Sequence, residues 1–204
     1  MDFLPIFLNI KNRNCMVVGG GEVAARKTAL LLKAGARITV IAPQIGMELQ
    51  EQLREQQGNI TYRAETFHPD HLEDAVLAIA ATSDPIVNRE VSEAAGRRRI
   101  PVNVVDNPAL CSFIMPSILD RSPIIVAVSS GGASPVLTRL LRARLETLIP
   151  SAYGRLAAYA AEYRTRVKRS FSHPEARRRF WENILQGPFA EMVFAGKDQA
   201  AKAC

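Results

Sequence analysis

The chain has 204 residues, of which 48% are hydrophobic and 23% charged, as is usual for a globular protein. This composition excludes a disordered, collagen-like or coiled-coil chain, and the longest apolar runs, such as residues 124–128, are too short to span a membrane. The net charge of +6 is uneven: residues 1–116 hold 12 Lys/Arg against 13 Asp/Glu, whereas residues 117–204 hold 14 against 7. The basic second half indicates either a polyanionic partner or a solubilising surface, and charge alone does not decide between them.

The termini and the cysteines predict a cellular compartment. Residues 1–5 contain neither the basic region nor the small-residue cleavage site of a secretory signal. Cys15, Cys111 and Cys204 are odd in number and lack the spacing of a zinc site, so we expect reduced thiols and no bound metal. We therefore predict a cytoplasmic protein without a membrane segment.

Residues 14–106 alternate short apolar runs with helix-length amphipathic segments. Asp84 followed by Pro85 has the pattern of a helix N-cap and first helical residue, and Gly35 has that of a C-cap. Because strands that alternate with helices form right-handed βαβ units, we predict an α/β fold with a Rossmann-like parallel sheet. The predicted strands are residues 14–18, 37–41, 60–63, 75–81 and 100–105, and the predicted helices are residues 22–34, residues 47–56 and a segment beginning at Pro85.

The pattern changes after Asp106. Strands predicted at 113–119 and 124–128 are separated only by the turn residues 120–123, so no crossover helix fits between them. A long helix is predicted from about Ser134 to residue 148, and the chain from residue 152 onward is also predicted to be helical. One stripe of the long helix is apolar and has no obvious partner in the first half; it comprises Val136, Leu137, Leu140, Leu141, Leu145 and Leu148.

The turn after the first predicted strand is rich in glycine and fits the pattern G-x-G-x-x-A through Gly19, Gly21 and Ala24. This pattern is weak alone, but here it lies between an apolar strand and an amphipathic helix, as in dinucleotide-binding domains. Gly19 permits the tight turn, and Gly21 lets the backbone approach a pyrophosphate at the helix N-terminus. The alternative is a glycine-rich turn that binds nothing.

The end of the second predicted strand lacks one part of the usual dinucleotide pattern. Residues 40–44 contain neither an acidic residue for the ribose hydroxyls nor an arginine for a 2′-phosphate. Backbone groups around Pro43 and Gln44 would then have to hold the ribose. The sequence therefore leaves NAD and NADP open at this point.

Two further loops follow predicted strands and are candidates for chemistry. Asp106 ends the fifth strand, where ligands of parallel sheets bind, so its carboxylate could transfer a proton; alternatively, it only caps the following turn. Ser129 and Ser130 begin the loop 129–132, whose backbone could bind an anion, or which could be a flexible linker.

Other charged and aromatic groups carry weaker signals. His68, His71 and His173 lack the spacing of metal ligands, and we predict that His68 and His71 lie on the surface. The arginine runs 97–99 and 177–179 are interpreted as solvated helix ends. Aromatic residues make up only 6% of the chain, so we expect no nucleic-acid partner.

Six ordered motifs together resemble one known family. They are Leu4-Pro-Ile-Phe; Val17-Val-Gly-Gly-Gly-Glu-Val-Ala with Arg26-Lys27; Ala78-Ile-Ala-Ala-Thr; Asn103-Val-Val-Asp; Ser112-Phe-Ile-Met-Pro-Ser; and Ala127-Val-Ser-Ser-Gly-Gly with Ser134-Pro-Val-Leu. They span essentially the whole chain and resemble precorrin-2 dehydrogenase/sirohydrochlorin ferrochelatase, the N-terminal module of siroheme synthase.

The resemblance implies a two-step activity. NAD⁺ would accept a hydride from precorrin-2 to give sirohydrochlorin, and Fe²⁺, a substrate and not a bound cofactor, would then be inserted to give sirohaem. It also implies an acid-base role for Asp106 and cofactor contacts at Gly21, Glu22 and Val23 and at Pro43 and Gln44. The implied assembly is a homodimer, and because the sequence ends at Cys204, a uroporphyrinogen methyltransferase is expected only as a separate partner.

These expectations agree with the charge pattern, because an eight-carboxylate tetrapyrrole would favour a basic half. Ser129 and Ser130 are thus predicted to bind substrate or to regulate its access, since a phosphate on Ser130 would repel such a polyanion. We predict a Rossmann-like NAD-binding domain at 1–112, a dimerisation segment at 113–149 and a helical C-terminal domain at 150–204. The alternatives are a dehydrogenase without useful chelatase activity and a nucleotide-sensing regulatory module.

Overall fold

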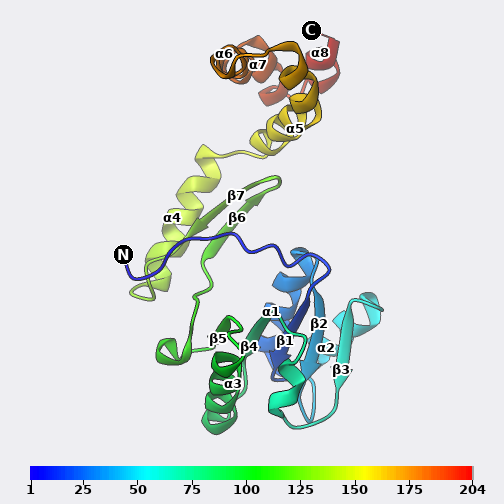
Figure 1. Cartoon of the computed structure of the whole chain (residues 1–204), viewed down its shortest axis with the longest axis vertical. Helices are drawn as coiled ribbons and strands as arrows, with labels where there is room; N and C mark the ends of the chain where they lie inside the picture. Colours follow the sequence, from blue (N-terminus) through cyan, green and yellow to red (C-terminus); the bar gives the residue numbers. More distant parts are fainter. Residues whose placement is uncertain (204) are drawn as a thin grey trace. The chain divides into compact units, whose positions relative to one another are not determined.

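The computed structural model describes residues 1–203 and divides the chain into two compact units, Met1–Met115 and Pro116–Cys204. Each unit has a sheet and helices of its own (Figure 1). The division predicted at 1–112, 113–149 and 150–204 is finer than these two units, and it stays a prediction.

The first unit contains one parallel sheet of five strands in the order β3-β2-β1-β4-β5 (Figure 1). The predicted α/β fold with a Rossmann-like sheet is therefore confirmed. The strand order reverses between β1 and β4, and ligands of such sheets bind at the carboxyl ends of the strands beside that reversal. The strands are β1 (Asn14–Val18), β2 (Arg37–Ile41), β3 (Ile60–Arg63), β4 (Leu77–Ala80) and β5 (Val102–Val104).

Helices cover both faces of this sheet because side chains along each strand alternate between the faces. The unit has three α-helices: α1 (Glu22–Lys33), α2 (Met47–Glu55) and α3 (Pro85–Arg97). It also has two short 3₁₀ helices, η1 (Pro69–Leu72) and η2 (Pro108–Leu110). Helices α1 and α2 share one apolar cluster with the sheet, and α3 and η1 share the other. Both faces are buried, which explains why β4 consists only of small and apolar residues.

Local capping fixes where α3 begins, as predicted. The carboxylate of Asp84 accepts hydrogen bonds from the backbone N–H groups of Ile86 (2.8 Å) and Val87 (3.4 Å). Pro85 occupies the first helical position, where a missing N–H costs nothing. The start of α3 is therefore set by residues that lie next to it in the sequence.

The second unit begins with an antiparallel pair, β6 (Ser117–Arg121) and β7 (Ile124–Val128). The strand predicted at 113–119 is wrong at its start, because the N–H groups of Ser112 and Phe113 donate to the carbonyl of Val102 in β5 (2.9 and 3.4 Å). Helix α4 (Pro135–Leu148) packs on this pair, and the hydroxyl of Ser134 accepts from Leu137 N–H (3.2 Å) at its N-cap.

Four more helices complete the second unit: α5 (Ala152–Ser170), α6 (Pro174–Gln186), α7 (Pro188–Phe194) and α8 (Asp198–Ala203). A small apolar cluster around Leu156 and Val193 holds them together. Arg155 adds polar contacts, donating to the carbonyl of Val193 (2.7 Å) and pairing with the carboxylate of Asp198 (3.2 Å). Gly154 permits α5 to approach the β6–β7 pair, because a Cβ there would overlap the backbone oxygens of Arg121 and Ser122.

Candidate functional site

The glycine turn between β1 and α1 is enclosed by the carboxyl ends of two neighbouring strands. Gly19 has a φ of +128°, and a Cβ there would overlap the backbone oxygen of Ala81, just after β4. A Cβ on Gly20 would overlap the backbone oxygen of Gln44, just after β2, and Gly20 accepts a hydrogen bond from Gly46 N–H (2.8 Å). Sequence reasoning missed Gly20, because its close neighbour Gln44 lies 24 residues further along the chain.

Gly21 has the opposite environment. A Cβ on Gly21 would meet no heavy atom within 4 Å, and the residue is exposed. It is the N-cap of α1 and provides no side-chain hydrogen bond, so the first N–H groups of the helix, those of Glu22 and Val23, have no side-chain cap from it. An uncapped helix N-terminus beneath open space fits the pyrophosphate of a dinucleotide.

A pocket of about 490 Å³ lies where β2 ends, lined by Pro43, Gln44, Ile45, Gln50 and Tyr62. The Tyr62 hydroxyl, from β3, donates toward the carbonyls of Ala42 (3.1 Å) and Pro43 (3.3 Å) and so holds the strand end in place. None of the lining side chains is charged. The pocket therefore offers neither a carboxylate for ribose hydroxyls nor a cation for a 2′-phosphate, and it leaves NAD and NADP open.

Asp106 lies in a tight turn directly after β5, on the edge of the sheet that also holds the glycine turn. Its φ of +58° is left-handed, a conformation that Asp tolerates better than most residues. Its side chain is exposed, and within residues 1–203 its carboxylate makes no hydrogen bond. The turn-capping role considered as an alternative is therefore not supported by any hydrogen bond in the described chain.

Lys27, on α1, is a charged neighbour of Asp106 that sequence reasoning did not single out as a site residue. The side chain is half-buried, and burial lowers the pKa of its ammonium group, with a further contribution from the positive charge of Arg26. Asp106 and Cys111 oppose that shift, so both lie close enough to act on the charge. Its half-buried position depends on how α1 packs, which the sequence does not reveal.

The loop 129–132 is organised by its own hydroxyl groups. The Ser129 hydroxyl accepts from Gly131 N–H (3.0 Å), and the Ser130 hydroxyl accepts from Ser134 N–H (2.9 Å) at the start of α4. Gly131 and Gly132 both have positive φ angles, +66° and +91°. The loop thus forms a turn held by these two contacts, and the roles predicted for Ser129 and Ser130 stay predictions.

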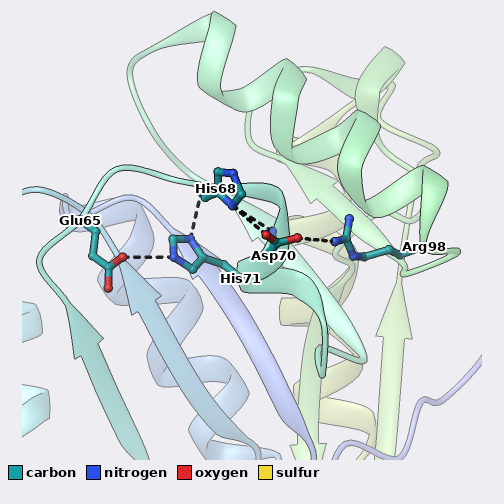
Figure 2. Close-up of polar contacts among 5 residues, drawn as sticks. All are labelled: Glu65, His68, Asp70, His71 and Arg98. Carbon is teal, nitrogen blue, oxygen red and sulfur yellow. Dashed lines mark hydrogen bonds and ion pairs between the residues drawn. The ribbon is translucent and has the colours of Figure 1, made fainter.

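A polar cluster joins the loop after β3 to α3 (Figure 2). His71 Nε2 lies 3.2 Å from Glu65 Oε2, while His71 Nδ1 accepts from His68 N–H (3.0 Å). Asp70 Oδ2 lies 3.3 Å from His68 Nδ1, and Asp70 Oδ1 lies 3.1 Å from an Arg98 guanidinium nitrogen. The prediction of two surface histidines is wrong for His71, whose side chain is 9% exposed, and it is confirmed for His68, at 66%.

No group of three or more His, Cys, Asp or Glu side chains among the described residues could hold a metal ion. No helix among them combines the length and hydropathy needed to cross a membrane.

Comparison with known proteins shows the family to which the chain belongs. A family model described as putative NAD(P)-binding matches residues 6–117, more than half of the sequence. The chain belongs to this NAD(P)-binding family. Models described as sirohaem biosynthesis protein central and as sirohaem synthase dimerisation region match residues 121–148 and 152–204. These matches confirm the resemblance to siroheme synthase that the six motifs predict.

Individual relatives agree with this placement. A siroheme synthase of Nitrosospira multiformis is 74% identical over 100% of this chain and 43% of its own length, and one of Nitrosomonas europaea is 68% identical over 99% and 42%. The NAD(P)-binding chain thus spans less than half the length of these curated relatives. Among solved structures, SirC, a precorrin-2 dehydrogenase, has a TM-score of 0.75 at 24% identity, with 99% of this chain and 100% of SirC covered, and shares its fold.

Proposed function

We propose that the chain is an NAD-dependent dehydrogenase of precorrin-2. The observation that carries the proposal is the pairing, on one edge of one sheet, of the open helix N-terminus at Gly21 with the exposed carboxylate of Asp106. The first suits a dinucleotide, and the second suits a proton acceptor. The names of the relatives, siroheme synthase and precorrin-2 dehydrogenase, support the choice of substrate.

In this proposal the residues of the first unit divide the work. Backbone N–H groups of Glu22 and Val23 hold the pyrophosphate, and the strand end around Pro43 and Gln44 holds the adenosine side. NAD⁺, when bound, supplies the hydride acceptor. Oxidation of precorrin-2 also releases a proton, and Asp106 takes it as general base.

We further propose that the same carboxylate serves iron insertion. Fe²⁺ is a substrate here, and its entry into sirohydrochlorin displaces two pyrrole N–H protons. Asp106, which is exposed, would accept these protons one at a time and pass each to solvent, and nucleotide binding would not be needed. No cluster of metal-ligand side chains among residues 1–203 is required by this scheme, because the macrocycle nitrogens bind the metal.

The second unit supports a homodimer. Val136 (56% exposed), Leu140 (59%) and Leu148 (69%) belong to the apolar stripe of α4, and more than half of each residue is exposed. An exposed apolar stripe of this kind marks an interaction surface. The matched model names residues 152–204 as the dimerisation region, beyond the predicted segment 113–149, so we propose that both segments contribute to the interface.

We propose separately that Ser129 and Ser130 contact carboxylates of the tetrapyrrole. The Ser130→Asp variant places a negative charge on a loop that should receive negative groups, whereas Ser130→Ala only removes the bond to Ser134 N–H. Precorrin-2 turnover should fall several-fold further in the Asp variant, and added salt should narrow the difference. Equal rates in the two variants would favour a linker role.

One assay tests the main proposal and separates it from the alternatives. Precorrin-2 and NAD⁺ are mixed with the chain, and the absorbance of sirohydrochlorin and of reduced nucleotide is followed. We expect both products to appear together, and addition of Fe²⁺ to give the spectrum of sirohaem faster than without protein. Oxidation without faster iron insertion would leave a dehydrogenase only, and nucleotide binding without oxidation would indicate a sensor.

A further inference from the structure

β5 is an edge strand, yet side chains occupy its outward backbone groups. On the inner side, Ala78 N–H donates to Pro101 and Val105 N–H donates to Ala80, both at 2.9 Å. Because backbone groups of successive strand residues point to opposite sides, Val102 and Val104 turn theirs away from β4. A sixth strand would normally bind them, but the described sheet ends at β5.

Residues 111 and 112 take the place of that strand, with the backbone N–H of Ser112 donating to the Val102 carbonyl (2.9 Å) and two side chains making the other contacts. The Ser112 hydroxyl accepts from Val102 N–H (2.8 Å) and lies 3.4 Å from the Val102 carbonyl oxygen. The Cys111 thiol does the same one step further along, accepting from Val104 N–H (3.1 Å) and lying 3.2 Å from the Val104 oxygen. We call these two side-chain contacts, of Ser112 with Val102 and of Cys111 with Val104, the anchors of β5. They have similar distances but different neighbouring residues.

Only the Cys111 anchor reaches the turn that contains Asp106. Its sulfur also lies 3.3 Å from the carbonyl oxygen of Asn107, so the single thiol proton is shared between Val104 and Asn107. These residues flank the turn on both sides. The remaining bond across the turn, from Asn107 N–H to the Val104 oxygen, is long at 3.3 Å. The thiol therefore closes the base of the turn.

The direction of the Asp106 side chain depends on this closure. No hydrogen bond within the described chain holds the carboxylate itself, and its left-handed φ of +58° is imposed by the turn. The charge that faces it from a packed element is that of Lys27 on α1. A charge of this kind attracts the carboxylate but does not fix its direction as a hydrogen bond would.

We propose that Cys111 is a positioning residue for Asp106, its thiol binding both sides of the turn and so aiming the carboxylate at the substrate. This proposal rests on the proposed dehydrogenase function. The thiol itself undergoes no chemistry in it. Misplacing a reacting group by about 1 Å can cost about 100-fold in rate, so loss of the anchor should appear in kcat.

Three variants test the proposal: Cys111→Ala removes the anchor, Cys111→Ser replaces it with a shorter donor and acceptor, and Ser112→Ala is the matched control on the same strand. We expect Cys111→Ala to lower kcat for precorrin-2 oxidation about 10- to 100-fold, with KM and NAD⁺ affinity changed less than about twofold. Cys111→Ser should recover part of the loss. Ser112→Ala should lower Tm to a similar extent and leave kcat within about twofold of native.

Equal kcat in Cys111→Ala and Ser112→Ala, at equal loss of Tm, would overturn the proposal and leave Cys111 a structural residue. Amide hydrogen exchange gives a reading that needs no substrate. Val104 N–H should exchange faster in Cys111→Ala, and Val102 N–H should exchange faster in Ser112→Ala. An unchanged exchange rate of Val104 N–H in Cys111→Ala would also overturn the proposal that the thiol holds the turn. If the native chain does not oxidise precorrin-2, the proposed function is refuted, and so is the claim that Cys111 positions Asp106 for catalysis. The exchange rates would still show whether the Cys111 thiol holds the turn.

Discussion

The two units of the chain bury their apolar residues differently. Beyond its first eight residues, the first unit encloses most of its large apolar side chains in two clusters, one on each face of its sheet. The second unit has one small buried helix cluster and leaves the apolar stripe of α4 exposed. The sheet of the first unit therefore has its own core on both faces, whereas the second unit leaves the apolar stripe of α4 as a candidate interaction surface.

Charge separates the units in the same way. Residues 1–116 are nearly balanced, whereas residues 117–204 carry 14 basic against 7 acidic side chains. The candidate chemistry, at Gly21 and Asp106, lies in the balanced unit. We infer that the first unit performs the reaction, whereas the second forms the dimer and attracts a polyanionic substrate. Four predictions follow from this division.

The largest effect is expected at Asp106. If the first unit performs the chemistry, Asp106→Asn should slow oxidation and iron insertion about 10²- to 10⁴-fold, the usual contribution of a general base. Asp106→Asn should keep native Tm, oligomeric mass and NAD⁺ affinity, whereas Asp106→Ala should keep mass and affinity but lose some Tm, because alanine tolerates the left-handed φ less well. Steady-state absorbance assays give the rates. A fully active Asn variant would exclude the acid-base role, and loss of oxidation alone would confine that role to the dehydrogenase step.

The glycine turn should separate binding from folding. A side chain on Gly21 points into open space, so Gly21→Asp should fold, yet its bulk and charge should weaken NAD⁺ binding about tenfold or more, or at least about 1.4 kcal/mol. Gly20→Ala should instead destabilise the unit by about 1–3 kcal/mol, because its Cβ overlaps the Gln44 oxygen. Calorimetry and thermal unfolding distinguish the two. Unchanged NAD⁺ affinity in Gly21→Asp would contradict the proposed site.

The exposed stripe of α4 should control assembly. Burying a leucine side chain contributes about 1.5–3 kcal/mol, so Leu140→Glu should weaken a dimer about tenfold or more. Light scattering should then show a mass shifted toward the 22.4 kDa of one chain, with NAD⁺ affinity unchanged. Gln56→Glu adds the same charge at an exposed polar site of the first unit and serves as control. A measured mass of about 22.4 kDa for the native protein at micromolar concentration, the mass of one chain, would refute the dimer.

Lys27 should give the smallest effect, on stability. Its pKa is lowered in the folded chain, so the charged form costs free energy of folding at neutral pH, and Lys27→Met should raise Tm slightly. As pH rises toward the ordinary value of 10.5, the native lysine loses its proton when folded, and the gain should disappear. Thermal unfolding between pH 7 and about pH 11 measures this. Lys33→Met, at an exposed position on α1, should show no gain.

Hydrophobic periodicity, together with glycine and proline at turns and helix ends, predicted most elements of the first unit. The strands β1, β2 and β3 begin and end at the predicted residues, because apolar runs and flanking glycines are local signals. The strand predicted at 113–119 began too early because residues 112 and 113 bind the edge of β5 instead of forming a strand. Pairing of this kind depends on tertiary contacts, which no local pattern encodes.

The candidate site divides in the same manner. Gly19, Gly21 and Asp106 follow from motif and strand position, whereas Gly20 and Lys27 matter because of residues distant in the sequence. Gly20 contacts Gln44, and Lys27 lies near Asp106. Their roles could be predicted only after the sheet order was known.

The side-chain anchors along β5 also bear on solubility. An edge strand with free N–H and C=O groups is a template on which a strand of another molecule can pair, and such pairing begins aggregation. The hydroxyl and backbone N–H of Ser112 and the thiol of Cys111 already occupy those groups on Val102 and Val104. This margin of the sheet is thereby closed to intermolecular β-pairing without the bulk of an additional strand, and the turn after it stays open to solvent.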